Sequence, residues 1–289
     1  MLESGRSYDG KGELMPEAPI VLDVEDVSKA FQVGRSLFSG VWRTRDDFTA
    51  VADASLQIRR GEVFGLIGES GSGKSTLGYL LGGIERPTSG SIKFCGALLE
   101  TMARTERRRF RQKTQIVFQD SGSALNPRRK IGSTLQDSLR LAGVPRSERE
   151  ARLNGILQMV GLAAEHASRY PHQLSGGQRQ RVGIARALAM TPDVLIADEP
   201  VSALDVSVQA QIINLLLDLR TKLGLTIVLI SHDIGVVAHA TDRVAVMHRG
   251  KIVETGSTAD VIHEPKHPYT RALISAVPKG LRHEGQIAQ

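Results

Sequence analysis

One segment constrains the fold of this 289-residue chain more than any other feature: Gly68-Glu69-Ser70-Gly71-Ser72-Gly73-Lys74-Ser75. An apolar stretch at 62–67, expected to be a strand, precedes it, and a helix is expected from near Lys74 to residues 82–83. The pattern G-x-x-x-x-G-K-S/T in this context is typical of a phosphate-binding loop. Its glycines let backbone N–H groups surround phosphate oxygens, because no Cβ blocks the approach. A plain glycine turn is the alternative, which the flanking strand and helix disfavour.

A second segment places two acids at the end of an apolar strand. Residues 194–197 are Val-Leu-Ile-Ala, and Asp198 and Glu199 follow them. Ligands of α/β proteins bind at the carboxyl ends of parallel strands, so both acids are expected near the phosphate loop. Lys74 is then expected to contact the β- and γ-phosphates of a nucleotide, and Ser75 to ligate Mg²⁺. Asp198 is expected to hold the same Mg²⁺, and Glu199 to orient and deprotonate the attacking water.

Strands and helices are expected to alternate along most of the chain. Apolar or alternating stretches predict strands at 20–27, 51–58, 62–67, 89–94, 114–118, 194–197 and 226–230. Helical spacing predicts helices at 178–190 and at 208–223, the second ending at Gly224. This alternation indicates an α/β protein with a largely parallel sheet. A helical stretch at about 125–175 interrupts it and predicts a separate subdomain, with a capping box at Ser147 and Glu150.

A third segment, Leu174-Ser175-Gly176-Gly177-Gln178, leads into a predicted helix and offers a second anion site. With it, the sequence over about residues 20–278 resembles the ATPase subunits of ABC transporters. LSGGQ is the signature of that family, and 68–75 and 194–199 match its two Walker motifs. Four further motif positions occur in order, at Phe31 (the aromatic that stacks on adenine), Gln119 (Q-loop), Asp205 (D-loop) and His232 (switch histidine).

The resemblance implies a P-loop NTPase (RecA-like) core with a mainly parallel sheet, an N-terminal antiparallel β subdomain and an inserted α-helical signature subdomain. It implies an ATPase domain at 20–255 with the helical subdomain at about 120–180, and a C-terminal extension at 256–289. Residues 1–19 show no periodicity and are expected to be a mobile tail. The implied catalytic residues are Glu199, His232, Gln119 and Lys74, and the implied Mg²⁺ ligands are Ser75, Gln119 and Asp198. The implied ATP-binding residues are Phe31, Gly68, Ser70, Gly71, Gly73, Lys74, Ser75, Thr76, Ser175, Gly176, Gly177, Gln178 and Asp205.

Two segments are similar to one branch of that family, the oligopeptide, dipeptide and nickel importers. They are Phe118-Gln119-Asp120 with the following 123–128, and the His-Pro-Tyr segment at 263–273. The residues at 33–48, expected to be an inserted loop, are similar to one of the two paired ATPases of that branch. Peptides are therefore the expected cargo, with nickel or another small solute as the alternative. Some members carry an iron–sulfur cluster, which this chain lacks the ligands for, because Cys95 is its one cysteine.

The resemblance also implies partners and a location. ATP is expected to lie between the phosphate loop of one subunit and the signature of a second ABC ATPase subunit, expected to be a paralogue. Two membrane permease subunits and, indirectly, an extracytoplasmic substrate-binding protein complete the expected assembly. The chain has no apolar run near the ~20 residues of a membrane-spanning helix, so it is expected to be peripheral, at the cytoplasmic face of the inner membrane.

Other classes of protein fit the sequence less well. The net charge of +6 raises the question of nucleic acid, but aromatic residues are only 4% and provide few stacking platforms, so no nucleic acid is expected. A soluble ABC-type ATPase that acts on DNA or ribosomes usually has two cassettes, a long coiled coil or zinc-binding cysteines. A regulatory module that binds ATP without hydrolysis would be expected to lack Glu199 or His232. A GTPase would need an Asn-Lys-x-Asp segment, which the sequence lacks.

Overall fold

The computed structural model describes residues 18–33, 46–119, 125–202 and 204–276. In chain order its strands and helices are β1 (Ile20–Val33), β2 (Asp46–Arg59), β3 (Val63–Ile67), α1 (Lys74–Leu81), β4 (Ser89–Phe94), β5 (Ala97–Leu98), α2 (Arg104–Lys113), β6 (Thr114–Val117), α3 (Ile131–Leu141), α4 (Arg149–Met159), α5 (Gly176–Leu188), β7 (Val194–Asp198), α6 (Val206–Leu223), β8 (Thr226–Ser231), α7 (Ile234–Ala240), β9 (Arg243–His248), β10 (Lys251–Ser257), α8 (Thr258–His263) and α9 (Pro268–Ser275). Short 3-10 helices at Leu99–Thr101, Ala164–Ser168 and Pro171–Gln173 lie between them.

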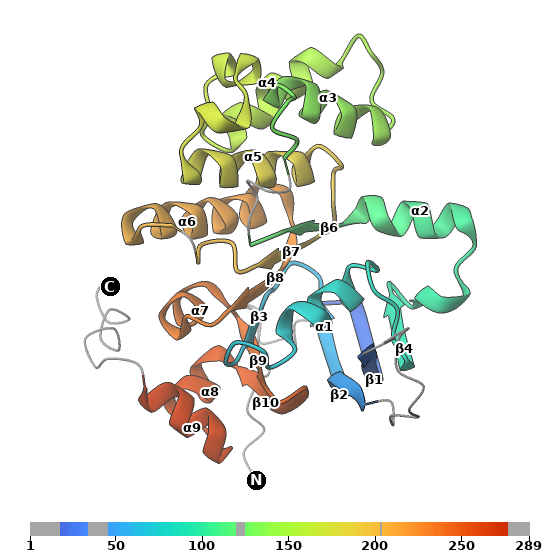
Figure 1. The fold of residues 1–289 in the computed structure, drawn as a ribbon, viewed down its shortest axis with the longest axis vertical. Coiled ribbons are helices and arrows are strands. Elements are labelled where there is room, and N and C mark those ends of the chain that lie inside the picture. Colours follow the sequence, from blue (N-terminus) through green and yellow to red (C-terminus); the bar gives the residue numbers. More distant parts are fainter. Residues whose placement is uncertain (1–17, 34–45, 120–124, 203, 277–289) are drawn as a thin grey trace, which may run out of the picture.

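Two sheets form the framework of the described chain. The larger has the strand order β10-β9-β3-β8-β7-β6, in which every neighbouring pair is parallel except β10 with β9. The smaller is antiparallel, with the order β2-β1-β4-β5. A mainly parallel core sheet beside an N-terminal antiparallel sheet is the predicted fold class, which is confirmed (Figure 1).

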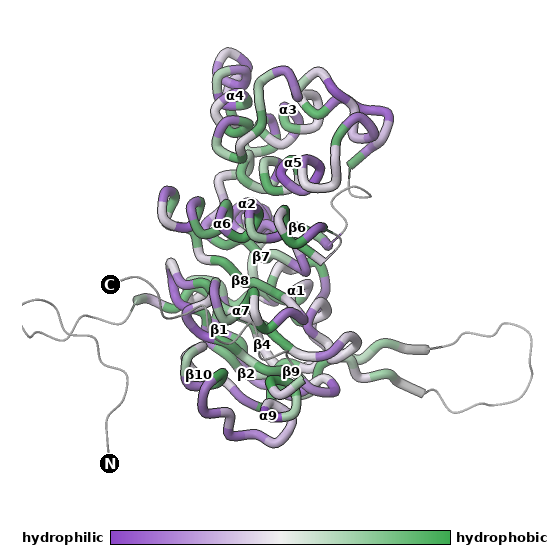
Figure 2. The backbone as a smooth tube through the Cα atoms, turned by 90° about the vertical axis from the view of Figure 1, so that its left-hand side faces the viewer, coloured by the Kyte–Doolittle hydropathy of each residue, from purple (hydrophilic) through white to green (hydrophobic). Residues whose placement is uncertain are grey.

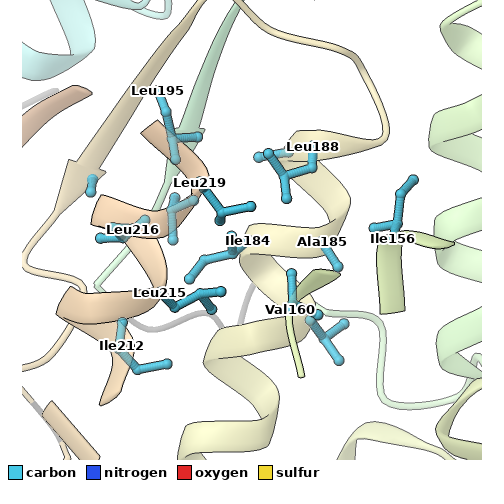
Figure 3. Packing of buried hydrophobic residues seen from close by; sticks show 14 of the residues in the cluster. Ile156, Val160, Ile184, Ala185, Leu188, Leu195, Ile212, Leu215, Leu216 and Leu219 are labelled. Atoms are coloured by element: carbon cyan, nitrogen blue, oxygen red, sulfur yellow. The ribbon is translucent and has the colours of Figure 1, made fainter. Parts of the chain in front are cut away.

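The core sheet buries both of its faces. Leu195 and Ala197 of β7 pack in a cluster with apolar residues of α5 and α6 (Figure 3). Val194 and Ile196 pack instead with α1 and with the antiparallel sheet. Side chains alternate along a strand, so these two clusters lie on opposite faces. Figure 2 shows hydrophobic residues following the central strands, as expected for a sheet covered on both sides.

A group of helices is inserted between β6 and β7. Helices α3, α4 and α5 form the group at the top of Figure 1 and share buried leucines such as Leu135 and Leu157. The capping box expected at Ser147 and Glu150 is wrong, because α4 begins at Arg149 with Glu148 as its N-cap. The Glu148 N–H donates to the Pro145 carbonyl (3.0 Å) in a preceding turn, which delays the start of the helix.

The C-terminal elements return to the core sheet. Helix α6 ends at Gly224, which adopts the left-handed conformation expected of a C-cap glycine (φ 65°). Strands β9 and β10 form a hairpin at one edge of the sheet, and α8 and α9 lie beside β10 (Figure 1). None of the described helices is both long and apolar enough to span a bilayer.

Candidate functional site

The phosphate loop joins β3 to α1 and depends on its glycines. Gly68, Gly71 and Gly73 have φ of 150°, 77° and 102°, which favour glycine. A Cβ on Gly68 would lie 2.2 Å from the Met247 carbonyl oxygen, and one on Gly73 would lie 2.3 Å from the Ala50 carbonyl oxygen. The backbone therefore curls against its neighbours in a way that only glycine permits. Such a cradle at a helix N-terminus fits a phosphate group.

Lys74 lies at the first position of α1 and bends back over the loop. Its Nζ donates to the carbonyl oxygens of Gly68 and Glu69, at 2.7 Å each. The residue is buried, and burial lowers the pKa of its ammonium, while the carboxylates of Glu199 and Asp198 oppose that shift. The nearby acids thus favour the charged form of the one lysine placed within the loop. Thr76 follows in the same helical turn, and Ser70 is exposed at the tip of the loop.

Ser75 and Asp198 meet across the edge of the sheet. The Ser75 hydroxyl donates to Asp198 Oδ1 at 2.9 Å, although the residues are 123 positions apart. Asp198 is buried, and burial raises the pKa of its carboxyl group, while hydrogen bonds from Ser75 and Tyr79 partly oppose this rise. A hydroxyl and a carboxylate are oxygen donors of the kind that Mg²⁺ prefers, and Mg²⁺ in nucleotide sites commonly takes only one or two protein ligands beside phosphates. These two residues fit that ion.

Glu199 and His232 form a second pair beside the first. His232 Nδ1 lies 3.2 Å from Glu199 Oε1; the glutamate side chain is 15% exposed and the histidine 56%. Glu199 has a positive φ of 45°, a strained conformation for a residue with a side chain, and its N–H donates to the Ile230 carbonyl (2.9 Å). The ends of the neighbouring strands β7 and β8 thus bring together two residues expected to act on the same reaction.

Gln119 and Phe31 lie on exposed surface. Gln119 follows the end of β6, and residues 120–124 beyond it lie outside the described chain. Phe31 pairs with Phe48 directly across β1 and β2, and both rings are exposed. Sequence reasoning missed Phe48, because strand pairing within 33–48 was not expected. Strand β1 extends to Val33 and β2 begins at Asp46, so both ends of the segment expected to be a loop are strand, and residues 34–45 lie outside the described chain.

The signature segment forms a capping box at the start of α5. Ser175 Oγ accepts the Gln178 N–H (3.2 Å), and Gln178 Oε1 accepts the Ser175 N–H (3.0 Å). A Cβ on Gly177 would lie 2.6 Å from Val208 Cγ1, so this glycine lets α5 approach α6 closely. Asp205 is exposed at the start of α6 and makes no side-chain capping bond; its neighbour Ala203 lies outside the described chain.

The predicted site residues thus fall into two groups. Lys74, Ser75, Asp198, Glu199 and His232 converge at the carboxyl ends of β3, β7 and β8. The segment 175–178 starts α5, which covers the sheet face opposite α1. Among the hydrogen bonds of the described residues, none joins the signature segment to the phosphate loop.

Profiles of two protein families match parts of this chain. The ABC transporter family profile matches residues 51–202, and a profile described as the oligopeptide/dipeptide transporter C-terminal region matches 253–288. A Brucella ovis protein, whose name provisionally assigns it as a peptide import ATP-binding protein, is 47% identical over 266 residues, which are 91% of this chain and 80% of that protein. A similarly named Brucella abortus protein is 46% identical over 264 residues, 91% of this chain and 78% of its own length.

Solved structures show the same likeness. The protein cbiO1 from Clostridium perfringens, described as part of the ABC transporter complex cbiONQ, has a TM-score of 0.73 and 30% identity over 91% of this chain and 98% of its own. The ATP-binding cassette MJ0796, solved as a dimer bound to ADP and phosphate, has a TM-score of 0.71 and 30% identity over 82% of this chain and 98% of its own. This chain therefore belongs to the ABC transporter family, as an ATP-binding ATPase subunit.

Proposed function

We propose that this chain powers an ABC importer for peptides by hydrolysing ATP at the carboxyl edge of its parallel sheet. The observation that carries the hydrolytic part is the Glu199–His232 pair at 3.2 Å, which adjoins the Ser75–Asp198 pair. A module that only held ATP would need neither a base nor a histidine at that place.

Each residue of this site has a proposed role. The loop N–H groups and Lys74 bind the phosphates of ATP, and an exposed aromatic at Phe31 stacks on the adenine. Ser75 and Asp198, with Gln119, hold Mg²⁺, which when bound neutralises charge on the phosphates. Glu199 takes the proton of the attacking water, and His232, held by Glu199 Oε1, contacts the γ-phosphate.

A complete site is proposed to need two chains. No hydrogen bond among the described residues joins the segment 175–178 to the phosphate loop of the same chain. We propose that Ser175, Gly176, Gly177, Gln178 and Asp205 close over ATP bound to a second ATPase subunit. The dimeric MJ0796 cassette, which resembles this chain in fold, supports such an arrangement. Closure on ATP and reopening after hydrolysis would then move two permease subunits that hold the chain at the cytoplasmic face of the membrane.

Replacing Ser175 tests the shared site. Ser175→Arg is expected to leave ATP binding to the isolated chain unchanged and to lower turnover of the assembled pair. Hydrogen bonds to charged groups contribute about 1.5–3 kcal/mol, so the loss in turnover is expected to be about ten- to a hundredfold. Ser257→Arg is the matched control, because Ser257 also caps a helix by accepting an N–H (Asp260, 3.1 Å) far from the signature. Full, non-cooperative turnover of the Ser175 variant by the isolated chain would contradict a shared site.

The proposed cargo is a di- to oligopeptide. The C-terminal region at 253–288 carries this proposal, since it matches the oligopeptide/dipeptide type, and relatives at 46–47% identity have names that assign them to peptide import. Nickel or another small solute is the alternative, because the segments that report this ancestry do not touch cargo.

Uptake measurements test the cargo. A strain that lacks this chain is expected to lose uptake of labelled di- to oligopeptides and to keep uptake of nickel. A strain that also lacks other peptide importers removes redundancy from the measurement. Unchanged peptide uptake in that strain would reject the peptide assignment while leaving the ATPase assignment in place.

A further inference from the structure

One peptide unit of the phosphate loop is held from both sides. Its carbonyl, on Gly68, accepts the Lys74 ammonium at 2.7 Å, and its N–H, on Glu69, donates to the Tyr269 hydroxyl at 3.1 Å. The C=O and N–H of a trans peptide point in opposite directions, and the described residues contain no cis bond. Lys74 and Tyr269 therefore hold the plane of the Gly68–Glu69 peptide from opposite sides, although Tyr269 is 200 positions from Glu69.

Tyr269, in the C-terminal helix α9, is itself held in place by a residue of β9 and by the N-cap of its own helix. Its ring stacks on His248 with 3.9 Å between centroids and 13° between planes. Its backbone N–H donates to His267 Nδ1 at 3.1 Å, which caps the start of α9. Burial raises the pKa of Tyr269 above its ordinary value, so at neutral pH its hydroxyl keeps its proton and remains a neutral acceptor.

The chain that leads to α9 is tied to the core sheet. The Glu254 carboxylate of β10 accepts the Lys266 N–H at 2.8 Å and the His267 N–H at 3.0 Å. Leu273 of α9 and Val261 of α8 pack in one apolar cluster with Ile67, the last residue before the loop. Since Ile67 precedes Gly68, the packing holds the residue that leads into the peptide unit which the hydrogen bond orients.

We propose that Tyr269 is a positioning residue for ATP binding, which orients the Gly68–Glu69 peptide so that its carbonyl holds Lys74 beneath the phosphates. The C-terminal extension thereby becomes part of the nucleotide site, as a brace between β10 and the loop. This inference rests on the proposed contact of Lys74 with phosphate. Hydrogen bonds in series polarise one another, so the hydroxyl also strengthens the carbonyl's hold on the ammonium.

Tyr269→Phe tests the proposal, because it removes the hydroxyl and keeps the ring on His248. An ordinary hydrogen bond contributes about 0.5–1.5 kcal/mol, so the KM for ATP is expected to rise about two- to tenfold, with kcat changed less than about twofold. Exchange of the Glu69 amide hydrogen in the full chain is expected to accelerate, while amides of β7 and β8 keep their protection. A thermal midpoint close to the unchanged chain's shows that the fold is retained.

Ser275→Ala is the matched control, since it deletes a hydroxyl from the same helix whose contact is the Ala272 carbonyl (2.8 Å). It is expected to change neither the KM nor Glu69 exchange. If Tyr269→Phe leaves either the KM or the Glu69 exchange unchanged, the positioning role is wrong. The proposed role of Lys74 is tested separately, because Lys74→Ala would then still impair ATP binding.

Discussion

Glu199→Gln is expected to bind ATP as well as the unchanged chain and to lose almost all turnover. The amide keeps the shape of the side chain and its place beside His232, but it cannot take a proton from the attacking water. General-base catalysis contributes about 10²–10⁴-fold, so phosphate release is expected to fall by about that factor. Steady-state phosphate release and equilibrium ATP binding are measured together.

The Glu25–Lys93 ion pair supplies a matched control for this change. Glu25→Gln makes the same chemical replacement at an exposed position of the antiparallel sheet, where the carboxylate pairs with Lys93 at 2.6 Å. Turnover of that variant is expected to stay unchanged. Near-normal hydrolysis by Glu199→Gln would remove Glu199 from the mechanism, and a parallel loss of ATP binding would assign it a role in binding.

Lys74→Ala is expected to impair both ATP binding and hydrolysis. The change removes the positive charge within the loop and leaves the carbonyls of Gly68 and Glu69 without their 2.7 Å partner. Lys74 is proposed to donate charge-assisted hydrogen bonds to the β- and γ-phosphates, and such bonds contribute about 1.5–3 kcal/mol each. Loss of both predicts a fall in ATP affinity of about a hundredfold or more. Equilibrium binding of ATP by the full chain measures this fall in affinity, and phosphate release measures the loss of hydrolysis.

Lys93→Ala is the corresponding control, because it deletes a lysine from an exposed ion pair far from the loop. It is expected to bind ATP normally. If Lys74→Ala binds ATP with unchanged affinity, the phosphate contact proposed for Lys74 is wrong, and the inference about Tyr269 fails with it.

Local patterns in the sequence predicted the centre of the fold. The apolar runs before Gly68 and Asp198 predicted β3 and β7, and both strands end within one residue of the expected position. Strands β3, β8 and β7 are parallel, so their carboxyl ends and the loops that follow them lie at one edge of the sheet. This topology brings Ser75 close to Asp198. The two strands were predictable because each is a short segment with a strong preference for the strand conformation.

Contacts that depend on how distant elements dock or on strand register were not predictable in the same way. The bond between Glu69 and Tyr269 depends on where α9 docks, and no local pattern encodes that docking. The pairing of Phe31 with Phe48 depends on strand register across the intervening residues. Ser147 carries a valid capping pattern, but the turn at Pro145 offers the backbone a competing hydrogen bond, and the helix starts later.

Peptide uptake with an altered catalytic base tests most directly whether hydrolysis at this site powers import. A strain that lacks this chain and other peptide importers is supplied with the unchanged chain or with Glu199→Gln, and uptake of labelled peptide is measured at equal protein levels. The unchanged chain is expected to restore uptake, and Glu199→Gln is expected to restore none above background. Equal uptake with both would contradict a mechanism in which ATP hydrolysis at Glu199 drives peptide import.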